Sequence, residues 1–401
     1  ELAPLLFAQA KPSKLGSTKA RESHAARLHI AGDHPNIRTI DEDHCMALDG
    51  MTLGLALSGG GYRATLFGLG SLTRLNDAGL LGKLDLITSV SGGSILAGIL
   101  AQRWNQLDFI DGRAANFEPV FARQVRDFCN RTIDIGAGLK GLANPFKSAG
   151  KYLIDCYDKH QFRGLSLKDI PKANTPGLPT FIFYATSLQT GRSFRFRQDY
   201  IADWKLGVSN HTDLPLALAV AASSAFPPLF SPIVIKTNPK SWTGGLAGPE
   251  RDAMRGRLVL SDGGVYDNLG LEVLQQGKVD YVLVSDAGAP FELETRPARG
   301  PLQMARVRDI LIDQTRALRK RMLIRDLASK RQKGAYWGID TLIGSYKDPR
   351  ALLKDSPETA AMARVPTRLA AFEPEVQQRL IRWGYALADV ALRKKAGLGV
   401  G

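Results

Sequence analysis

Cysteine and histidine are scarce in this chain of 401 residues, which contains three cysteines and six histidines. Cys45, Cys129 and Cys156 are widely spaced and form neither a C-x-x-C pair nor another metal-binding pattern. We therefore expect reduced thiols, as in a cytoplasmic protein, and neither a metal nor another cofactor.

Long apolar runs are also missing. No window holds about 18 uninterrupted apolar residues, so we expect no transmembrane helix. The first residues, ELAPLLFAQAKPSK, have a short apolar part without a basic lead, which does not fit an intact signal peptide. Apolar residues nevertheless make up 44% of the chain, enough for a large folded core.

Acidic residues are too few to balance the basic ones, and the net charge is +14. Such a surface attracts polyanions, either nucleic acid or an anionic membrane face. Residues 303–333 hold ten Lys and Arg against three Asp, and a helix there would place apolar residues on one face (Leu311, Thr315, Leu318, Met322 and Ile324). This basic helix would lie on a membrane, or would be an ordinary surface helix that packs one face on the core.

The order of apolar runs predicts an α/β fold. From Met51 to about residue 104, short buried strands alternate with helical patterns, which favours a parallel sheet covered by helices. We expect an N-terminal extension over 1–50, a main domain over 51–290 and a mainly helical region over 291–401 that packs on the core. Residues 101–178 are less regular and are interpreted as a cap-like insertion.

A run of three glycines, Gly59 to Gly61, stands between the first strand and the first helix. Their backbone N–H groups can converge on one point, and the helix N-terminus favours negative charge there, which suits a phosphate or an oxyanion. The spacing up to Ala64 also fits a dinucleotide fingerprint. A dinucleotide site needs an acidic residue at the end of the second strand, whereas Asp85 precedes that strand and Ser91 ends it.

The segment LITSVSGGSILAG, residues 86–98, places Ser91 between an apolar run and two glycines. The nucleophile elbow has the pattern G-x-S-x-G, and here Ser89 replaces its first glycine. By itself the segment fits a nucleophile elbow and an ordinary tight turn equally well. Ser58 and Ser94 lie nearby, but neither has this position between strand and helix.

A nucleophilic serine needs a base. Only His160 and His211 follow the elbow, one in the irregular insertion and one in a polar turn, so a Ser-His-Asp triad is poorly supported. A carboxylate acting directly as the base is the simpler choice. Asp262 follows a predicted strand and precedes two glycines; Asp286 is its rival and Asp267 a weaker one.

Three motifs in this order, SGGGYRA, SVSGGS and DGG, resemble the patatin-like phospholipase family, as does ASSAFPPLFSP. The motif GGGYRA is closer to the cytosolic phospholipase A and fungal phospholipase B branch than to plant patatins, which carry lysine and glycine in this motif. The resemblance covers about residues 51–290. It implies a three-layer fold with a mostly parallel central sheet and helices on both faces.

The resemblance also implies roles for individual residues. Ser91 would be the nucleophile and Asp262 the base of a Ser–Asp dyad. Gly59, Gly60 and Gly61 would form the oxyanion-hole loop, with the N–H groups of Gly60 and Gly61 as donors, and Arg63 would lie near a lipid phosphate or the oxyanion. The implied reaction is phospholipase A or lysophospholipase-type ester hydrolysis through an acyl-enzyme, on phospholipid or another acyl lipid.

Two other functions fit the sequence. One is a soluble esterase or thioesterase for short acyl chains. The other is a basic protein that binds lipid or nucleic acid without turnover, although nucleic acid is not the partner that the motifs favour. For the leading function we expect a cytoplasmic protein in peripheral contact with an anionic membrane through 303–333.

Overall fold

The computed structural model of the protein describes residues 50–133, 148–276, 279–296, 299–300, 303–396 and 398. The predicted N-terminal extension and Cys45 lie outside these residues, apart from Gly50. The described residues belong to one compact unit.

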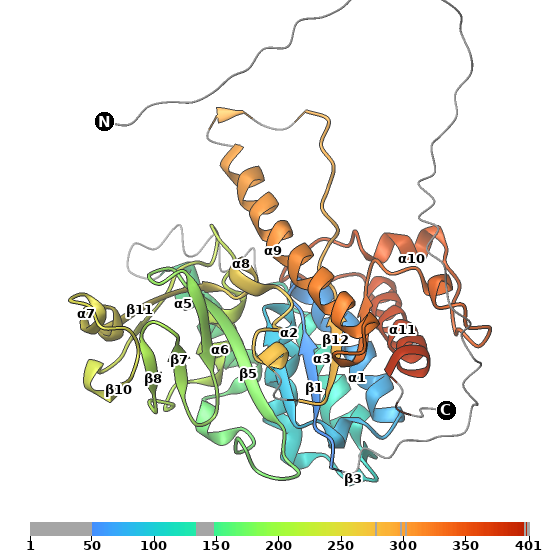
Figure 1. Ribbon diagram of the computed structural model, residues 1–401, viewed down its shortest axis with the longest axis horizontal. Coiled ribbons are helices and arrows are strands. Elements are labelled where there is room, and N and C mark those ends of the chain that lie inside the picture. Colours follow the sequence, from blue (N-terminus) through green and yellow to red (C-terminus); the bar gives the residue numbers. More distant parts are fainter. Residues whose placement is uncertain are drawn as a thin grey trace, which may run out of the picture. The chain divides into compact units, whose positions relative to one another are not determined.

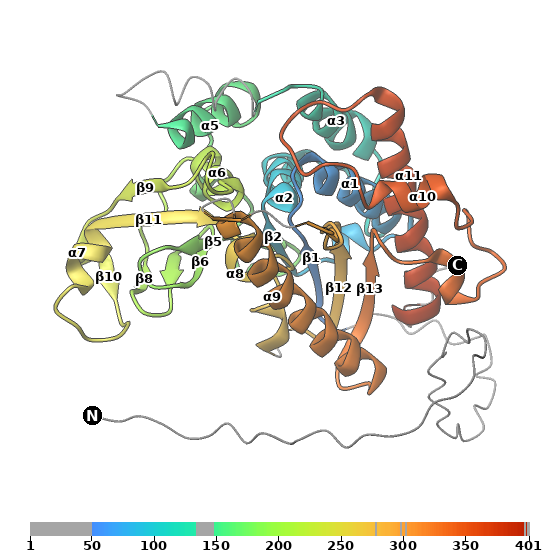
Figure 2. The ribbon, with the colours of Figure 1, turned by 90° about the horizontal axis from the view of Figure 1, so that it is seen from above.

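Five parallel strands form the centre of the main sheet (Figure 1), and the labels of Figure 2 show their order, β13-β12-β1-β2-β5. β1 and β2 are fully buried, as the short apolar runs before the glycine run and before Ser91 predict. The strands are β1 (Leu53–Leu57), β2 (Leu86–Val90), β5 (Thr180–Ser187), β12 (Tyr281–Asp286) and β13 (Lys333–Gly338).

The sheet continues beyond β5 with antiparallel strands. Gly191, at φ 64°, lies in the turn that returns the chain from β5 to its neighbour, as the sequence indicated. The fold is therefore the expected three-layer α/β class, with a mixed sheet that is parallel only at its centre. The remaining strands are β6 (Arg192–Phe196), β7 (Ile201–Asp203), β8 (Gly207–Ser209), β9 (Ile233–Lys236), β10 (Trp242–Thr243) and β11 (Arg257–Asp262), with β3 (Phe109–Ile110) and β4 (Arg113–Ala114) in a separate hairpin.

Helices cover both faces of the sheet (Figure 2). Leu53, Leu55 and Leu57 of β1 point into the larger core with α1, α2 and α11, while Ala56 points into a smaller core that includes Leu323 of α9. The helices are α1 (Gly61–Asp77), α2 (Gly92–Arg103), α3 (Arg123–Cys129), α5 (Ala149–Tyr157), α6 (Leu216–Ser224), α7 (Arg251–Gly256), α8 (Gly264–Asp267), α9 (Gln303–Ala328), α10 (Pro357–Met362) and α11 (Pro374–Ala391). Among the described helices, none combines the length and the apolarity needed to cross a bilayer.

The C-terminal region does more than cover the core with helices. β13 pairs in parallel with β12 and extends the sheet, an element that the sequence analysis missed because its short run GAYWG follows the basic segment. α11 lies directly on α1, where a Cβ at Gly70 would approach the Ile381 carbonyl oxygen to 1.9 Å and one at Gly384 would approach that of Phe67 to 2.0 Å. Both glycines are required for this close helix contact.

Candidate active site

Ser91 forms the sharp turn between β2 and α2. Its φ of 52° and ψ of −118° are unfavourable for a residue with a Cβ, so the turn stores strain. A Cβ on Gly92 would lie 2.0 Å from the Gly61 carbonyl oxygen, and one on Gly93 would lie 2.3 Å from that of Leu57. The two glycines therefore let α2 begin directly against the glycine run and the end of β1, which gives the geometry of an elbow.

Ser89 fits the elbow without a positive φ because it is still part of β2. Its buried hydroxyl accepts a hydrogen bond from the Ser94 hydroxyl at 2.9 Å and donates to the Ile182 carbonyl at 3.3 Å. The nearby Ser58 hydroxyl accepts the N–H of Ala287 at 2.7 Å. These three serines are thus bound within the framework, whereas Ser91 stands at the turn.

Asp262 ends β11 and meets Ser91 by strand register. β2 pairs with β5 up to Val90 and Tyr184, while β11 runs antiparallel on β5 and places Asp262 beside Ala185, the next residue along. β6 pairs with residues 183–187 of β5, so β2 and β11 must share the other edge. The two strands therefore meet end to end, with Ser91 and Asp262 at the junction.

Burial controls the charge of Asp262, which is only 2% exposed. It raises the pKa of the carboxyl to about 7, against the smaller lowering by the hydrogen bonds of the Gly264 N–H and the Ser91 hydroxyl. The Gly264 N–H donates to Oδ1 at 2.7 Å, and Oδ2 makes no hydrogen bond of ordinary geometry in the described part of the chain. The carboxyl group of Asp262 is therefore influenced by the Ser91 hydroxyl and keeps one buried oxygen available as an acceptor.

The rival carboxylates have other partners. Asp286 accepts hydrogen bonds from Arg316 at 2.8 Å, from the Tyr336 hydroxyl at 2.7 Å and from the Gly288 N–H at 2.8 Å. Burial raises the pKa of Asp286, but the charges of Arg316 and Lys320 and the hydrogen bonds from Arg316 and the Gly288 N–H together lower it. Asp267 caps the following turn by accepting two backbone N–H groups, at 3.0 and 2.9 Å. The Asp267 carboxylate also pairs with Arg319 at 3.5 Å, so both rivals are bound by partners other than Ser91.

The glycine run lies against the elbow. Gly59 donates its N–H to the Asn268 carbonyl at 3.0 Å, and a Cβ there would lie 3.1 Å from the Ser91 Cβ. Gly60 and Gly61 have φ values of 141° and 57°, which favour glycine. Within the described residues their N–H groups donate no hydrogen bond, so two amides of the run remain available at the N-terminus of α1.

Arg63 is buried behind the glycine run. Its Nε donates to the Ala287 carbonyl at 3.0 Å and its Nη1 to the Val365 carbonyl at 2.6 Å. A Cβ on Gly60 would lie 2.8 Å from Nη2, so the guanidinium supports that glycine directly. Burial, then repulsion by Arg316, lowers the pKa of Arg63 to about 10, and it stays charged at neutral pH. Its contacts are with the framework and not with the surface.

The end of α6 contacts both halves of the site, which the sequence analysis did not foresee. The Ser223 hydroxyl accepts the Ser91 N–H at 3.0 Å, its carbonyl accepts the Gly263 N–H at 3.1 Å, and the Ala225 carbonyl accepts the Asp262 N–H at 3.0 Å. Asn268 is a second missed residue, because its carbonyl binds Gly59. For Ser223, the segment ASSAFPPLFSP was the only signal in the sequence, and nothing in the sequence pointed to Asn268.

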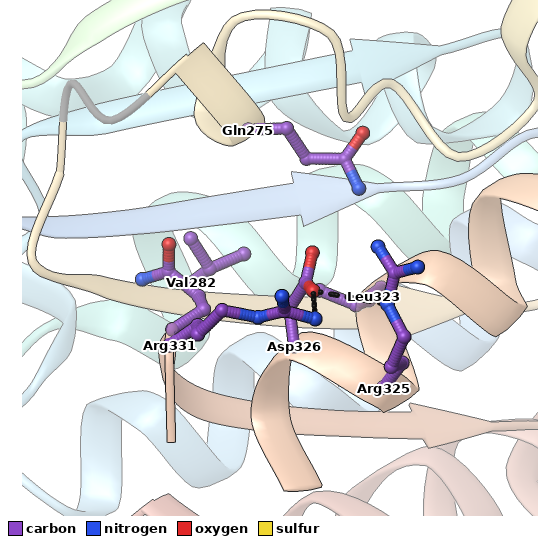
Figure 3. A pocket seen from close by; sticks show the side chains of 7 residues that line it. Gln275, Val282, Leu323, Arg325, Asp326 and Arg331 are labelled. Carbon is purple, nitrogen blue, oxygen red and sulfur yellow. Dashed lines mark hydrogen bonds and ion pairs between the residues drawn. The ribbon is translucent and has the colours of Figure 1, made fainter. Parts of the chain in front are cut away.

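A cavity lies away from the Ser91 elbow. A cavity of about 400 Å³ between α9 and β12 is lined by Val282, Leu323 and the polar side chains drawn in Figure 3. Arg325 and Arg331 both pair with Asp326 there, at 3.3 and 2.8 Å, and no residue of the Ser91 elbow takes part. No His, Cys, Asp and Glu cluster suited to a metal occurs among the described residues.

Residues 55–274, more than half of the chain, match the patatin-like phospholipase family. The chain belongs to this family. Lysophospholipase 1 of Candida albicans is 38% identical over 101 residues, which cover 23% of this chain and 16% of that protein.

Among solved structures, human GIVD cytosolic phospholipase A2 matches with a TM-score of 0.50 and 12% identity, over 87% of this chain and 60% of that chain. The same human protein in complex with methyl gamma-linolenyl fluorophosphonate matches with a TM-score of 0.52 and 15% identity, over 87% and 58%. These matches show the shared fold. The chain spans less than two-thirds of the length of each of these proteins.

Proposed function

We propose that the protein is a lipid acyl hydrolase that cleaves carboxylic esters with a Ser91–Asp262 dyad. The observation that carries the proposal is the end-to-end meeting of β2 and β11, which brings a strained serine to a buried carboxyl of raised pKa. A pKa of about 7 suits a general base at neutral pH, because a base whose pKa is near the working pH is both ionised and able to take a proton.

In the proposed reaction, Asp262 takes the hydroxyl proton of Ser91 as Oγ attacks the ester carbonyl carbon. The tetrahedral intermediate collapses when the proton passes to the leaving alcohol or lysolipid oxygen, which leaves an acyl-Ser91. Water then attacks the acyl group with Asp262 again as the base, and fatty acid is released.

The free N–H groups of Gly60 and Gly61 support an oxyanion hole, with Gly59 bound to Asn268 as the anchor of the loop. One donor of this kind contributes about 3 kcal/mol to the transition state. We assign Arg63 a place behind this loop, where it contacts Gly60 and its positive charge lies near the proposed oxyanion. In this role Arg63 does not contact a lipid phosphate directly.

Family membership supports an acyl-lipid substrate, and α9 supports peripheral contact with an anionic membrane. Met304, Leu311, Leu318 and Met322 are 48–67% exposed and recur along one side of the helix. Near the start of α9, Arg308 donates to the Pro227 carbonyl at 3.1 Å. Pro227 follows just after the end of α6, and this helix end binds the backbones of Ser91 and Asp262. The exposed apolar side and the basic residues of α9 would thus approach the membrane close to the site.

Hydrolysis of a defined phospholipid panel by the wild type and by Ser91→Ala, with products identified by mass, tests the proposal. We expect fatty acid and lysolipid from the wild type only. Methyl gamma-linolenyl fluorophosphonate, present in the complex of the human relative, should label the wild type at Ser91. Full esterase activity of Ser91→Ala contradicts the proposal, and activity on short-chain esters or thioesters alone points to the soluble esterase.

A further inference from the structure

The hydroxyl of Ser223 belongs to a chain of buried hydroxyl groups beneath the elbow. It lies 2.8 Å from the Ser94 hydroxyl, which donates to Ser89 at 2.9 Å, and Ser89 donates to the Ile182 carbonyl at 3.3 Å. Since Ser94 gives its proton to Ser89, the proton between Ser223 and Ser94 must come from Ser223. The Ser223 oxygen is left as an acceptor, and it accepts the N–H of Ser91 at 3.0 Å.

The donor and acceptor roles therefore run in one direction, from the Ser91 N–H through the three hydroxyl groups to the middle of the sheet. Each hydroxyl accepts one hydrogen bond and donates one, and hydrogen bonds in such a chain strengthen one another. The far end is fixed at Ile182 of β5, the strand on which both β2 and β11 pair. The four serine residues are all at least 92% buried, so water does not compete freely for these groups.

The Ser91 N–H needs this acceptor because of the turn. At φ 52° and ψ −118° the residue is outside both strand and helix geometry, and the pairing of β2 with its neighbouring strands ends before it, so the Ser91 N–H takes the Ser223 hydroxyl as its acceptor. The same helix end also accepts the backbone N–H of Asp262 and of Gly263, through Ala225 and Ser223. One helix terminus therefore fixes the backbones on both sides of the Ser91–Asp262 junction.

We propose that Ser223 is a positioning residue, whose hydroxyl holds the strained elbow so that the Ser91 Oγ stays aligned with Asp262. This inference rests on the proposed function of Ser91. The proposal also accounts for serine at position 89. Its hydroxyl accepts the hydrogen bond from Ser94, and a glycine at this position would leave Ser94 without that acceptor. Among the described residues, the Ser223 hydroxyl bonds to the Ser91 backbone N–H and the Ser94 hydroxyl and acts on the Ser91 Oγ only through the backbone.

Ser223→Ala removes the acceptor of the Ser91 N–H and leaves the backbone contacts to Asp262 and Gly263. Ser71→Ala is the matched control, because Ser71 is a fully buried helical serine that binds Phe67, Ser285 and Trp337. With a soluble chromogenic ester we expect Ser223→Ala to lower kcat roughly 10- to 100-fold at nearly constant KM, and Ser71→Ala to change kcat less than about threefold. Thermal unfolding of both variants reports their loss of stability.

The pH profile separates positioning from general loosening. If only the alignment of Ser91 is lost, the maximal kcat falls and the pH of half-maximal activity stays near that of the wild type. A loosened site would admit water to Asp262 and move this midpoint to lower pH. Equal kcat for Ser223→Ala and Ser71→Ala, or a lowered midpoint in Ser223→Ala, overturns the inference.

If Ser223→Ala does not fold, Ser94→Ala decides, since it removes the next hydroxyl of the chain and keeps Ser223 in place. A loss of kcat greater than that of Ser71→Ala supports the inference, and wild-type kcat overturns it. Labelling by a fluorophosphonate keeps the two proposals apart. A wild type that is not labelled at Ser91 contradicts the proposed function, whereas labelling of Ser223→Ala at the wild-type rate contradicts only the role of Ser223.

Discussion

Asp262 is a carboxyl group shielded from water, and the N–H of Gly264 is its one backbone donor among the residues that the structure describes. Burial raises its pKa to about 7, so below that pH the group is mostly protonated and cannot accept the Ser91 proton. We therefore expect kcat to rise with pH along a one-proton limb that is half complete near pH 7. Rates on a soluble ester from pH 5 to 9 measure it, and a limb centred near pH 4 contradicts the assignment.

The same raised pKa affects stability. Between the unfolded pKa of about 3.9 and the folded pKa of about 7, the folded protein binds more protons at Asp262 than the unfolded chain does. The contribution of Asp262 to stability is therefore present at low pH and is lost as the pH rises through this window. We predict that Asp262→Asn loses activity by about 10³-fold or more and raises Tm by a few degrees at pH 8. A lower Tm than the wild type at pH 8 contradicts the linkage.

Asp286 provides the contrast at the residue scale. Its carboxylate binds Arg316 in a buried pair, and Asp286→Asn leaves that guanidinium with backbone carbonyls only. We predict a loss of about 3–5 kcal/mol of unfolding free energy, while the activity per folded molecule stays far above that of Asp262→Asn. Asp340→Asn, which removes a partly exposed ion pair with Lys320 of α9 at 3.5 Å, should cost less than about 1 kcal/mol. Urea unfolding and titration of active sites check both values.

At the scale of elements, the N-terminus of α1 depends on glycine. A Cβ on Gly61 would meet the carbonyl oxygen of Arg368 at 2.6 Å and would stand at φ 57°. We predict that Gly61→Ala displaces the loop and lowers kcat by about 10²-fold or more, because a donor to the oxyanion is misplaced. Gly191→Ala is the control, with a similar φ of 64° and open space around the Cβ. It should cost about 1 kcal/mol of stability and leave kcat unchanged.

The helix α9 packs on the sheet through Arg316 and Leu323 and leaves its other sides exposed. Both sequence interpretations of 303–333 therefore have support: one face packs on the core, and Leu311, Leu318 and Met322 point elsewhere. The sequence analysis placed Ile324 on the same face, which is wrong: Ile324 is exposed too, but the turn of the helix puts it on a different side.

Replacing Leu311, Leu318 and Met322 by glutamine should weaken binding to anionic vesicles at least tenfold, since each replacement removes apolar surface that would enter the lipid. Glutamine at Leu342 and Leu352, which are 62% and 58% exposed outside α9, is the matched control. Hydrolysis of a soluble ester should not change in either variant. Vesicle sedimentation at low and high salt checks the result, and unchanged binding of the α9 variant refutes the membrane assignment.

At the scale of the whole molecule, the site depends on two strands from distant parts of the chain. β2 and β11 both pair with β5, so the alignment of Ser91 with Asp262 depends on the registers Val90 with Tyr184 and Asp262 with Ala185. A slip of one residue in either register would turn the side chain to the other face of the sheet. The C-terminal region contributes to the same framework through β13 and Arg316, and not only as a cover.

The sequence by itself determined the strand-to-helix turns, because glycine runs after short apolar strands allow few other conformations, and it determined the three motifs and their order. It also predicted the α/β class and the basic helix. It left Asp262, Asp286 and Asp267 as rivals, since the electrostatic environment of a carboxylate is made by neighbours far away in the chain. Only the tertiary structure paired Asp286 with Arg316 and kept Asp262 buried, with one oxygen that makes no hydrogen bond of ordinary geometry to the described residues. It likewise placed Ser223 and Asn268, whose contacts span 132 residues in the case of Ser223 and Ser91.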